Sequence, residues 1–156
     1  MKIGIIGAMD IEVEELINSM DDIKKEDISR IDFYEGKLQD KDVVVAKCGV
    51  GKVHAAVCTQ TMILKYAPDA IINIGVAGSL SNELDFADIV ISDGVVQHDF
   101  DVSPFGKPVG LITGIDLVKI PCSEELVKRL LSAAEILEDT NIAVGTVASG
   151  DQFISS

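Results

Sequence analysis

The stretch KIGIIGAMDIEVEELINSM, residues 2–20, decides the predicted fold because its hydrophobic periodicity changes partway along. Lys2–Gly7 is a short apolar run that ends in glycine, which is typical of a buried strand. Asp10 can then cap a helix over Ile11–Met20. The helix carries one apolar stripe at a spacing of three to four residues, formed by Val13, Leu16, Ile17 and Met20. A strand followed by an amphipathic helix indicates an α/β protein.

The next segments continue this alternation. Asn18–Ser29 is acidic and polar, and we expect a surface connection there. Arg30–Gln39 and Asp42–Lys47 are predicted strands joined by a tight turn at 39–41, so they form an antiparallel hairpin and make the sheet mixed. A helix should follow Gly49-Val50-Gly51 and end near Tyr66, before Ala67-Pro68.

The second half of the chain repeats the pattern with a long interruption. The predicted elements are a central strand at Ala70–Ile74, a strand at Ala87–Asp93, a long loop at Gln97–Gly114, a helix from the cap Ser123 to about Glu138, and a strand at Ile142–Ser149. We therefore predict one α/β domain over residues 1–156, with a central mixed sheet flanked by helices. No element follows the last strand, so we expect the C-terminal part of the domain to be missing.

Composition and charge exclude several classes of protein. Hydrophobic residues make up 47% of the chain, and the net charge is −13, from 26 acidic and 13 basic residues. Such a field repels phosphate backbones and anionic lipid, so we expect neither a nucleic-acid nor a membrane partner. No apolar run approaches the ~20 residues that a bilayer requires, and the N-terminus lacks a secretory pattern. The three cysteines have no metal-ligand spacing, which favours reduced, mostly buried thiols in a cytoplasmic protein.

Three glycine-containing turns are candidate parts of a site, because each follows a predicted strand. They are Gly7-Ala8-Met9, Gly49-Val50-Gly51 and the turn from Gly75 to Gly78. Ligands bind at the carboxyl ends of strands in open α/β sheets, although each glycine alone could simply permit a tight turn. The first turn lacks the GxGxxG pattern of dinucleotide sites, and Val53 follows Gly51-Lys52 where a P-loop has Ser or Thr.

Glu12 is the candidate catalytic residue. On a helical wheel it falls at the edge of the apolar stripe, one turn in from the end of the first strand, whereas Glu14 and Glu15 fall away from it. A partly shielded carboxylate beside the ligand crevice can take a proton from water. The alternative is a carboxylate that only interacts with the helix dipole, and periodicity alone leaves both interpretations open.

The two histidines give weaker signals. His54 lies within an apolar helix and is more typical of a packed or surface side chain than of a catalyst. His98-Asp99-Phe100-Asp101 contains metal-ligand residue types, but no second His or Cys stands at a useful spacing, so a hydrogen-bonded cluster in the long loop is the favoured interpretation. We expect no metal and no cofactor.

Several motifs, in order and spacing, resemble the 5′-methylthioadenosine/S-adenosylhomocysteine nucleosidases. They are MKIGIIGAM followed by Glu12, GVGKVHAA (49–56), INIGVAGSL (72–80), ADIVISD (87–93), HDFDVSPFG (98–106) and SGDQFI (149–154). The resemblance spans nearly the whole chain. It implies a nucleoside phosphorylase-like three-layer architecture, a homodimer, and hydrolysis of the bond between adenine and ribose in methionine salvage.

The resemblance also implies roles for particular residues. Glu12 would activate the attacking water, and Phe153 and the Ile154 backbone would hold adenine. Met9 and Val50 would line the binding region for the sugar and the alkylthio group. Ala8 and the turn Val76, Ala77 and Gly78 would lie near the ribose and the water. Val102 and Phe105 would reach across the dimer and close the alkylthio pocket of the neighbouring subunit.

Two departures from the family pattern affect these expectations. Val76 stands where the family usually has Ser, and a valine side chain cannot hydrogen-bond to water or ribose. Family members also continue into a Met-Glu pair that holds the ribose hydroxyls and an Asp that protonates adenine, and neither follows here. If Ser156 is the true end, we expect little or no activity.

Two alternative functions stay open at this point. A phosphate-dependent nucleoside phosphorylase of the same fold would need positive charge, yet the first turn of the opening helix carries carboxylates and no Arg. A non-catalytic α/β ligand-binding domain would account for missing C-terminal chemistry.

Overall fold

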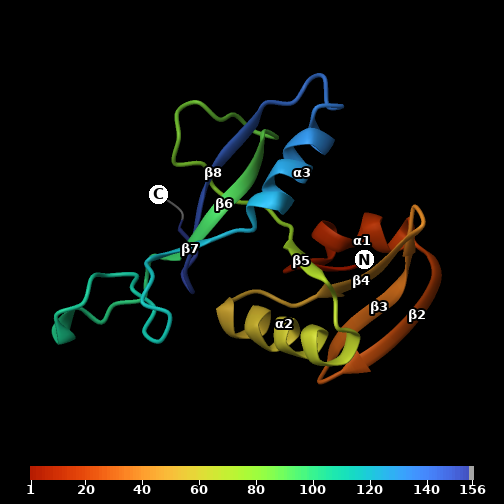
Figure 1. Ribbon diagram of the computed structural model, residues 1–156, viewed down its shortest axis with the longest axis horizontal. Helices are drawn as coiled ribbons and strands as arrows, with labels where there is room; N and C mark the ends of the chain where they lie inside the picture. Colours follow the sequence, from red (N-terminus) through yellow and green to blue (C-terminus); the bar gives the residue numbers. More distant parts are fainter. Residues whose placement is uncertain (155–156) are drawn as a thin grey trace. The chain divides into compact units, whose positions relative to one another are not determined.

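The computed structural model describes residues 1–154, which fall into two compact units, Met1–Ala77 and the residues from Gly78 onward (Figure 1). Each unit has its own mixed sheet and at least one helix against it. The prediction of a single domain over 1–156 stays a prediction, and each unit is described by itself.

The first unit is built on a five-stranded sheet in the order β2-β3-β4-β1-β5. Its elements are β1 (Lys2–Gly7), α1 (Asp10–Asn18), β2 (Asp21–Ile28), β3 (Ile31–Leu38), β4 (Lys41–Lys47), α2 (Lys52–Tyr66) and β5 (Ala70–Asn73). β1 runs parallel to β4 and β5, whereas β3 is antiparallel to β2 and β4. The antiparallel hairpin of β3 and β4 confirms the predicted mixed sheet.

The prediction of a surface connection at Asn18–Ser29 is wrong, because most of this segment is the edge strand β2. Its side chains are almost all exposed, so the hydrophobic alternation that identifies a strand is absent. The backbone ladder to β3 forms nevertheless, and it closes through a two-residue turn in which Ser29 and Arg30 have φ of 56° and 65°. A polar edge strand of this kind resists pairing with other chains.

The predicted turn at 39–41 is confirmed. Leu38 pairs with Lys41, and between them Gln39 and Asp40 have φ of 46° and 66°. Left-handed conformation at both central residues matches the right-handed twist of a hairpin.

Strand β4 lies at the centre of the packing. Val43 and Val45 pack with Val13 of α1 on one face, whereas Val44 and Ala46 join the cluster around α2 on the other. The α2 cluster includes Phe33, Cys58 and Met62, all completely buried. A strand covered on both faces needs an unbroken apolar run, which accounts for the sequence VVVA.

Three further expectations for the first unit need correction. β5 is an edge strand of this sheet rather than a central one, since β1 occupies the inner position between β4 and β5. Helix α1 ends at Asn18, and Met20 reaches the core from beyond the helix. Its N-cap is Met9 rather than Asp10, because the Glu12 side chain accepts the Met9 N–H from inside the first turn.

The second unit contains a three-stranded sheet in the order β7-β6-β8. Its elements are β6 (Ile89–Gln97), the 3₁₀ helix η1 (Ser103–Phe105), β7 (Lys119–Pro121), α3 (Glu124–Ala134) and β8 (Ile142–Ser149). β6 is parallel to β8 and antiparallel to β7. The predicted strand at Ile142–Ser149 is confirmed.

Other boundaries in this unit differ from the prediction. β6 starts later than predicted, because Ala87 has a φ of 73° and lies in a turn outside the strand. At its other end the strand runs four residues beyond Asp93, to Gln97. The Ser123 hydroxyl caps α3 at the Leu126 N–H, 3.4 Å away, as predicted, but the helix ends at Ala134 rather than Glu138. The short β7 was not predicted, since three residues carry no readable periodicity.

The three cysteines are mostly buried, as predicted. Cys48 and Cys58 are buried and Cys122 is half-buried, and all three are free. No helix within residues 1–154 has the length and apolar character needed to cross a bilayer.

We predict that Tyr66 ionises late. Burial, the nearby Glu26 carboxylate and the 3.2 Å hydrogen bond donated to it raise the pKa of Tyr66 to about 12. A phenol ionises near ~10 in an unfolded chain, so its contribution to stability is present below that pH and is lost as pH rises through 12. In a spectrophotometric titration at alkaline pH, Tyr66→Phe should lose the last absorbance step. Tyr34→Phe should keep it, and a late step that survives in Tyr66→Phe would contradict the assignment.

Candidate active site

Three strand ends come together at one edge of the first unit. Gly7 pairs with Lys47 and Ile6 with Asn73, so β1, β4 and β5 end side by side. Beyond the ladders, the Cys48 N–H donates to Gly7 O at 2.8 Å, and the Ile74 N–H donates to Ile6 O at 2.9 Å. The predicted gathering of the glycine turns is thus observed for residues 7–9, 49–51 and 75–77.

The Glu12 carboxylate joins two of these turns. Its Oε2 accepts the N–H groups of Ala8 at 2.6 Å and Met9 at 2.9 Å, and its Oε1 accepts the N–H of Val76 at 3.2 Å. The side chain is half-buried. Both oxygens act as acceptors, which suits the ionised form of a carboxylate. A role limited to the helix dipole does not account for the bond to Val76, which lies 64 residues further along the chain.

Two glycines leave space for the Glu12 side chain. A Cβ on Gly75 would lie 2.8 Å from Glu12 Oε1, and a Cβ on Gly7 would lie 3.1 Å from Glu12 Cβ. Both distances are shorter than ordinary carbon contacts. These glycines therefore let the backbone approach another group closely, as predicted. That group is the Glu12 side chain, whereas the prediction was a ligand.

Lys47 is a site residue that the sequence analysis missed. Its ammonium lies 2.7 Å from Asp10 Oδ1, and this contact raises the pKa of Lys47. Lys47 ends β4 opposite Gly7, and that register is the signal that could have found it. The Lys47 ammonium pairs with Asp10, whereas the Glu12 carboxylate accepts main-chain N–H groups.

The other predicted residues of the first unit lie in the turns that follow β1, β4 and β5. Ala8 is half-buried, Met9 is 38% exposed, Val50 is 71% exposed and Val76 is 81% exposed, and Ala77 is also exposed. His54 is exposed, and its Nδ1 lies 2.7 Å from Val50 O. The histidine is thus a surface side chain in contact with the turn at 49–51, and its non-catalytic interpretation stays a prediction.

The remaining predicted residues belong to the second unit. Phe105 in η1 and Phe153 are highly exposed, Gly78 and Ile154 are exposed, and Val102 is half-buried at the start of η1. Their approach to Glu12 stays a prediction. Asp99 and Asp101 accept backbone N–H groups, from Asp151 at 2.7 Å and Ser103 at 2.8 Å, as expected for a hydrogen-bonded cluster. Within residues 1–154, no group of three or more His, Cys, Asp or Glu could hold a metal ion.

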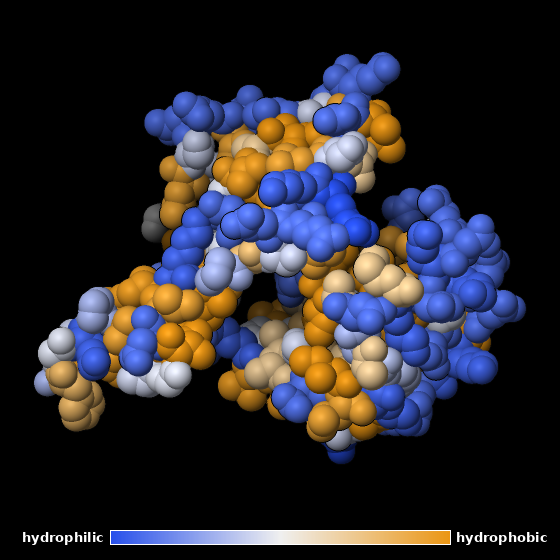
Figure 2. Space-filling model, in the orientation of Figure 1, coloured by the Kyte–Doolittle hydropathy of each residue, from blue (hydrophilic) through white to orange (hydrophobic). Residues whose placement is uncertain are grey.

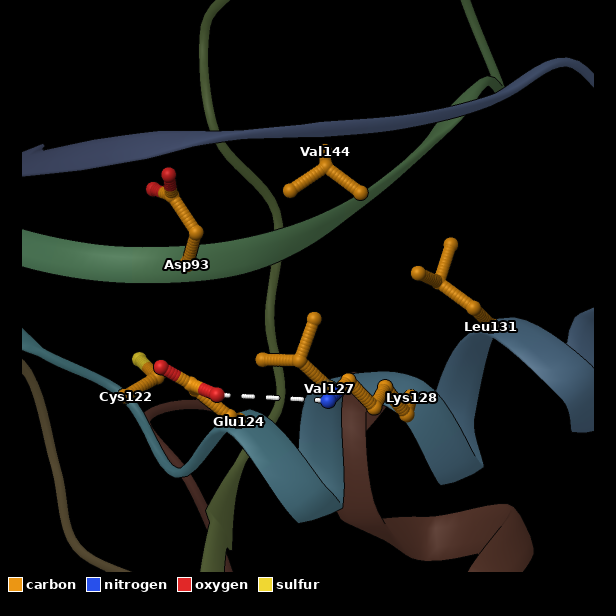
Figure 3. A pocket seen from close by; sticks show the side chains of 7 residues that line it. All are labelled: Asp93, Cys122, Glu124, Val127, Lys128, Leu131 and Val144. Atoms are coloured by element: carbon orange, nitrogen blue, oxygen red, sulfur yellow. Dashed lines mark ion pairs between the residues drawn. The ribbon is translucent and has the colours of Figure 1, made fainter.

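The second unit also contains a cavity of about 280 Å³ between the start of α3 and the strands β6 and β8 (Figure 3). Cys122 and Asp93 lie at one end, Val127, Leu131 and Val144 form an apolar wall, and Glu124 pairs with Lys128 at its rim. None of the predicted site residues lines it, and the mixed lining offers no arrangement of nucleophile and base.

Comparison with known proteins identifies relatives of the whole chain. The family model described as the phosphorylase superfamily matches residues 2–156. A curated relative, the 5′-methylthioadenosine/S-adenosylhomocysteine nucleosidase of Shewanella sediminis (strain HAW-EB3), is 45% identical over 154 residues. That match covers 99% of this chain, which spans 66% of the length of the relative.

Solved structures give the same result. The nucleosidase of the same name from Neisseria meningitidis, in complex with methylthio-immucillin-A, has a TM-score of 0.96 and 35% identity, over 99% of this chain and 67% of that one. The enzyme from Colwellia psychrerythraea 34H, in complex with adenine, has a TM-score of 0.95 and 32% identity, over 100% of this chain and 64% of that one. The predicted fold class, mixed sheet flanked by helices, is confirmed.

We predict that Gly75→Ala destabilises the first unit, because the new Cβ would displace the Glu12 carboxylate from its backbone donors. The expected loss in the free energy of unfolding is about 1–3 kcal/mol, measured by urea denaturation. Gly145→Ala is the matched control, since a Cβ there meets only Val90 Cγ1 at 3.5 Å. Equal effects of the two substitutions would contradict the packing role of Gly75.

Proposed function

The chain belongs to the phosphorylase superfamily, and from this premise we propose that the full-length protein hydrolyses the N-glycosidic bond of 5′-methylthioadenosine and S-adenosylhomocysteine. The observation that carries the proposal is the carboxylate of Glu12, held by three backbone N–H groups where the strand ends meet. The names of the similar nucleosidases support the choice of substrates.

The reaction exchanges one bond for another at the anomeric carbon. As the bond between C1′ and the adenine nitrogen breaks, positive charge develops on the ribose, and the oxygen of a water molecule bonds to C1′. The water proton passes to Glu12, and the leaving adenine takes up a proton as well. The family resemblance assigns the second proton to an aspartate that follows the segment 149–154 in family members.

The surroundings of Glu12 suit the role of a general base. A base must be ionised and must be held within reach of the proton that it accepts. The donors from Ala8, Met9 and Val76 support both requirements, because they stabilise negative charge and fix the position of both oxygens. The carboxylate also favours positive charge on the ribose in the transition state.

The exposed turns around Glu12 suit an uncharged nucleoside. Met9 and Val50 would contact the sugar and the alkylthio group, while Ala8, Val76, Ala77 and Gly78 would lie near the ribose and the water. Phe153 would stack on adenine, and the Ile154 backbone would hydrogen-bond to it. The exposure of Phe153, 94%, is consistent with an aromatic ring that is covered when a purine binds.

The proposal includes a cytoplasmic homodimer that acts in methionine salvage, with Val102 and Phe105 closing the neighbouring subunit's alkylthio pocket. Exposed apolar side chains support such a partner, since they would be covered at an interface. They include Phe105, 85% exposed, and Val53 and Leu64 of α2, 72% and 76% exposed. Figure 2 shows apolar surface over α2, in contrast to the hydrophilic surface over β2.

We predict that Glu12→Gln in the full-length protein lowers kcat for adenine release by about 10²- to 10⁴-fold, because an amide cannot accept the water proton. The measurement is adenine release from 5′-methylthioadenosine. Glu14→Gln is the matched control, since Glu14 is an exposed carboxylate on the same helix, and its rate should stay within about 2-fold of wild type. Near-normal turnover by Glu12→Gln, with an unchanged melting temperature, would remove the assigned role.

We also predict that adenine release does not depend on phosphate. A phosphate dianion needs cationic partners, yet Glu12 and Asp10 bring negative charge to this edge and Lys47 already pairs with Asp10. Initial rates should therefore agree within about 2-fold between a phosphate buffer and a phosphate-free buffer of equal ionic strength. Strict dependence on phosphate would instead identify a phosphorylase.

A further inference from the structure

Within the second unit, the loop that follows β6 is fastened to the segment that follows β8. The two strands are parallel and end together, with Gln97 paired to Ser149. The hydrogen bonding continues past the strands, because the His98 N–H donates to Ser149 O at 3.1 Å. The segment after Ser149 therefore leaves the sheet directly beside His98 and Asp99.

Asp99 fixes this segment through its carboxylate. Its Oδ2 accepts the Asp151 N–H at 2.7 Å, and the Asp99 side chain is half-buried. A carboxylate bond to a backbone N–H is charge-assisted and so is stronger than a neutral one. Asp151 lies two residues before Phe153, so this bond sets the direction in which the chain approaches Phe153 and Ile154.

Gly150 makes the approach of the two segments possible. A Cβ at this position would lie 2.9 Å from His98 Cε1 and 3.1 Å from Asp99 Cγ. Neither neighbour could keep its place beside a larger residue. The glycine therefore has a packing reason that is independent of the hydrogen bond, and both observations point to a fixed path for the chain at 150–151.

The position of Asp99 is itself held by the loop that carries it. Gly110 N–H donates to Phe100 O at 2.7 Å, and the Asp101 carboxylate caps the turn at the Ser103 N–H, 2.8 Å away. These bonds hold the chain at residue 100 and at residues 101–103, directly after Asp99. Asp99 is thus attached to an ordered loop, which a positioning role requires.

We propose that Asp99 is a positioning residue for purine recognition, which holds Gly150 and Asp151 so that Phe153 and Ile154 meet adenine in a fixed orientation. This inference rests on the proposed function, because it takes adenine as the group that Phe153 and Ile154 bind. Asp99 touches neither the substrate nor the reacting atoms. Its substitution should weaken binding of the purine without weakening binding of the sugar.

The test compares wild type with Asp99→Ala, Asp99→Asn and the control Asp139→Ala in the full-length protein. Asp139 is exposed and lies in a turn of the same unit, so its replacement removes the same charge. The first measurement is hydrogen exchange at the amides of residues 150–154. Exchange should be about 10-fold faster in Asp99→Ala and unchanged in Asp139→Ala, because only the first loses the acceptor of the Asp151 N–H.

The second measurement is product inhibition by adenine and by 5-methylthioribose, which lacks the purine. In Asp99→Ala the inhibition constant of adenine should rise about 10-fold, while that of 5-methylthioribose stays within about 2-fold. Asp99→Asn should recover most of the adenine affinity, since its amide oxygen can still accept the Asp151 N–H. This rescue separates a specific contact from a general loss of structure.

The outcomes distinguish the two proposals. Unchanged hydrogen exchange in Asp99→Ala, or an equal rise in both inhibition constants, would overturn the positioning role. A wild-type protein that neither releases adenine from 5′-methylthioadenosine nor is bound by adenine would overturn the proposed function before any variant is compared.

Discussion

The three hydrogen bonds to the Glu12 carboxylate are the constraint on which the candidate site depends. They link the start of α1 to the turn after β5, two segments that only the parallel pairing of β1 with β5 brings together. The same carboxylate caps the N-terminus of α1 by accepting the N–H of Met9, the N-cap residue. A single side chain thus contributes to the local fold of a helix, to the joining of two strand ends and to the proposed chemistry.

This arrangement also explains which neighbouring residues must be small. A Cβ on Gly75 would crowd the Glu12 carboxylate, and a Cβ on Gly7 would crowd Val13 Cγ1 and Glu12 Cβ at the start of α1. Gly150 has a comparable role in the second unit, beside His98 and Asp99. In both places glycine lets a backbone approach a carboxylate closely, and the carboxylate in turn satisfies backbone N–H groups.

The sequence predicted most elements whose hydrophobic pattern reflects burial, such as β4 and the strand at Ile142–Ser149. It could not predict β2, because an edge strand with exposed polar side chains follows no burial pattern, and its pairing depends on β3. Periodicity placed Glu12 at the edge of the apolar stripe but left its role open, since the Val76 donor lies in a distant turn. Lys47 was missed for the same reason, because its pairing with Asp10 follows from the register of β1 and β4.

The valine at position 76 illustrates why a departure from a family motif need not remove a site. The resemblance suggested Ser there, and the loss of a hydroxyl put the placement of water in doubt. The bond from residue 76 to Glu12 comes from the backbone N–H, which is present whichever side chain the residue carries. The Val76 residue is 81% exposed, so its side chain contributes little packing to the turn. Substitution at this position therefore alters what meets the water or the ribose, while the support of the proposed base is preserved.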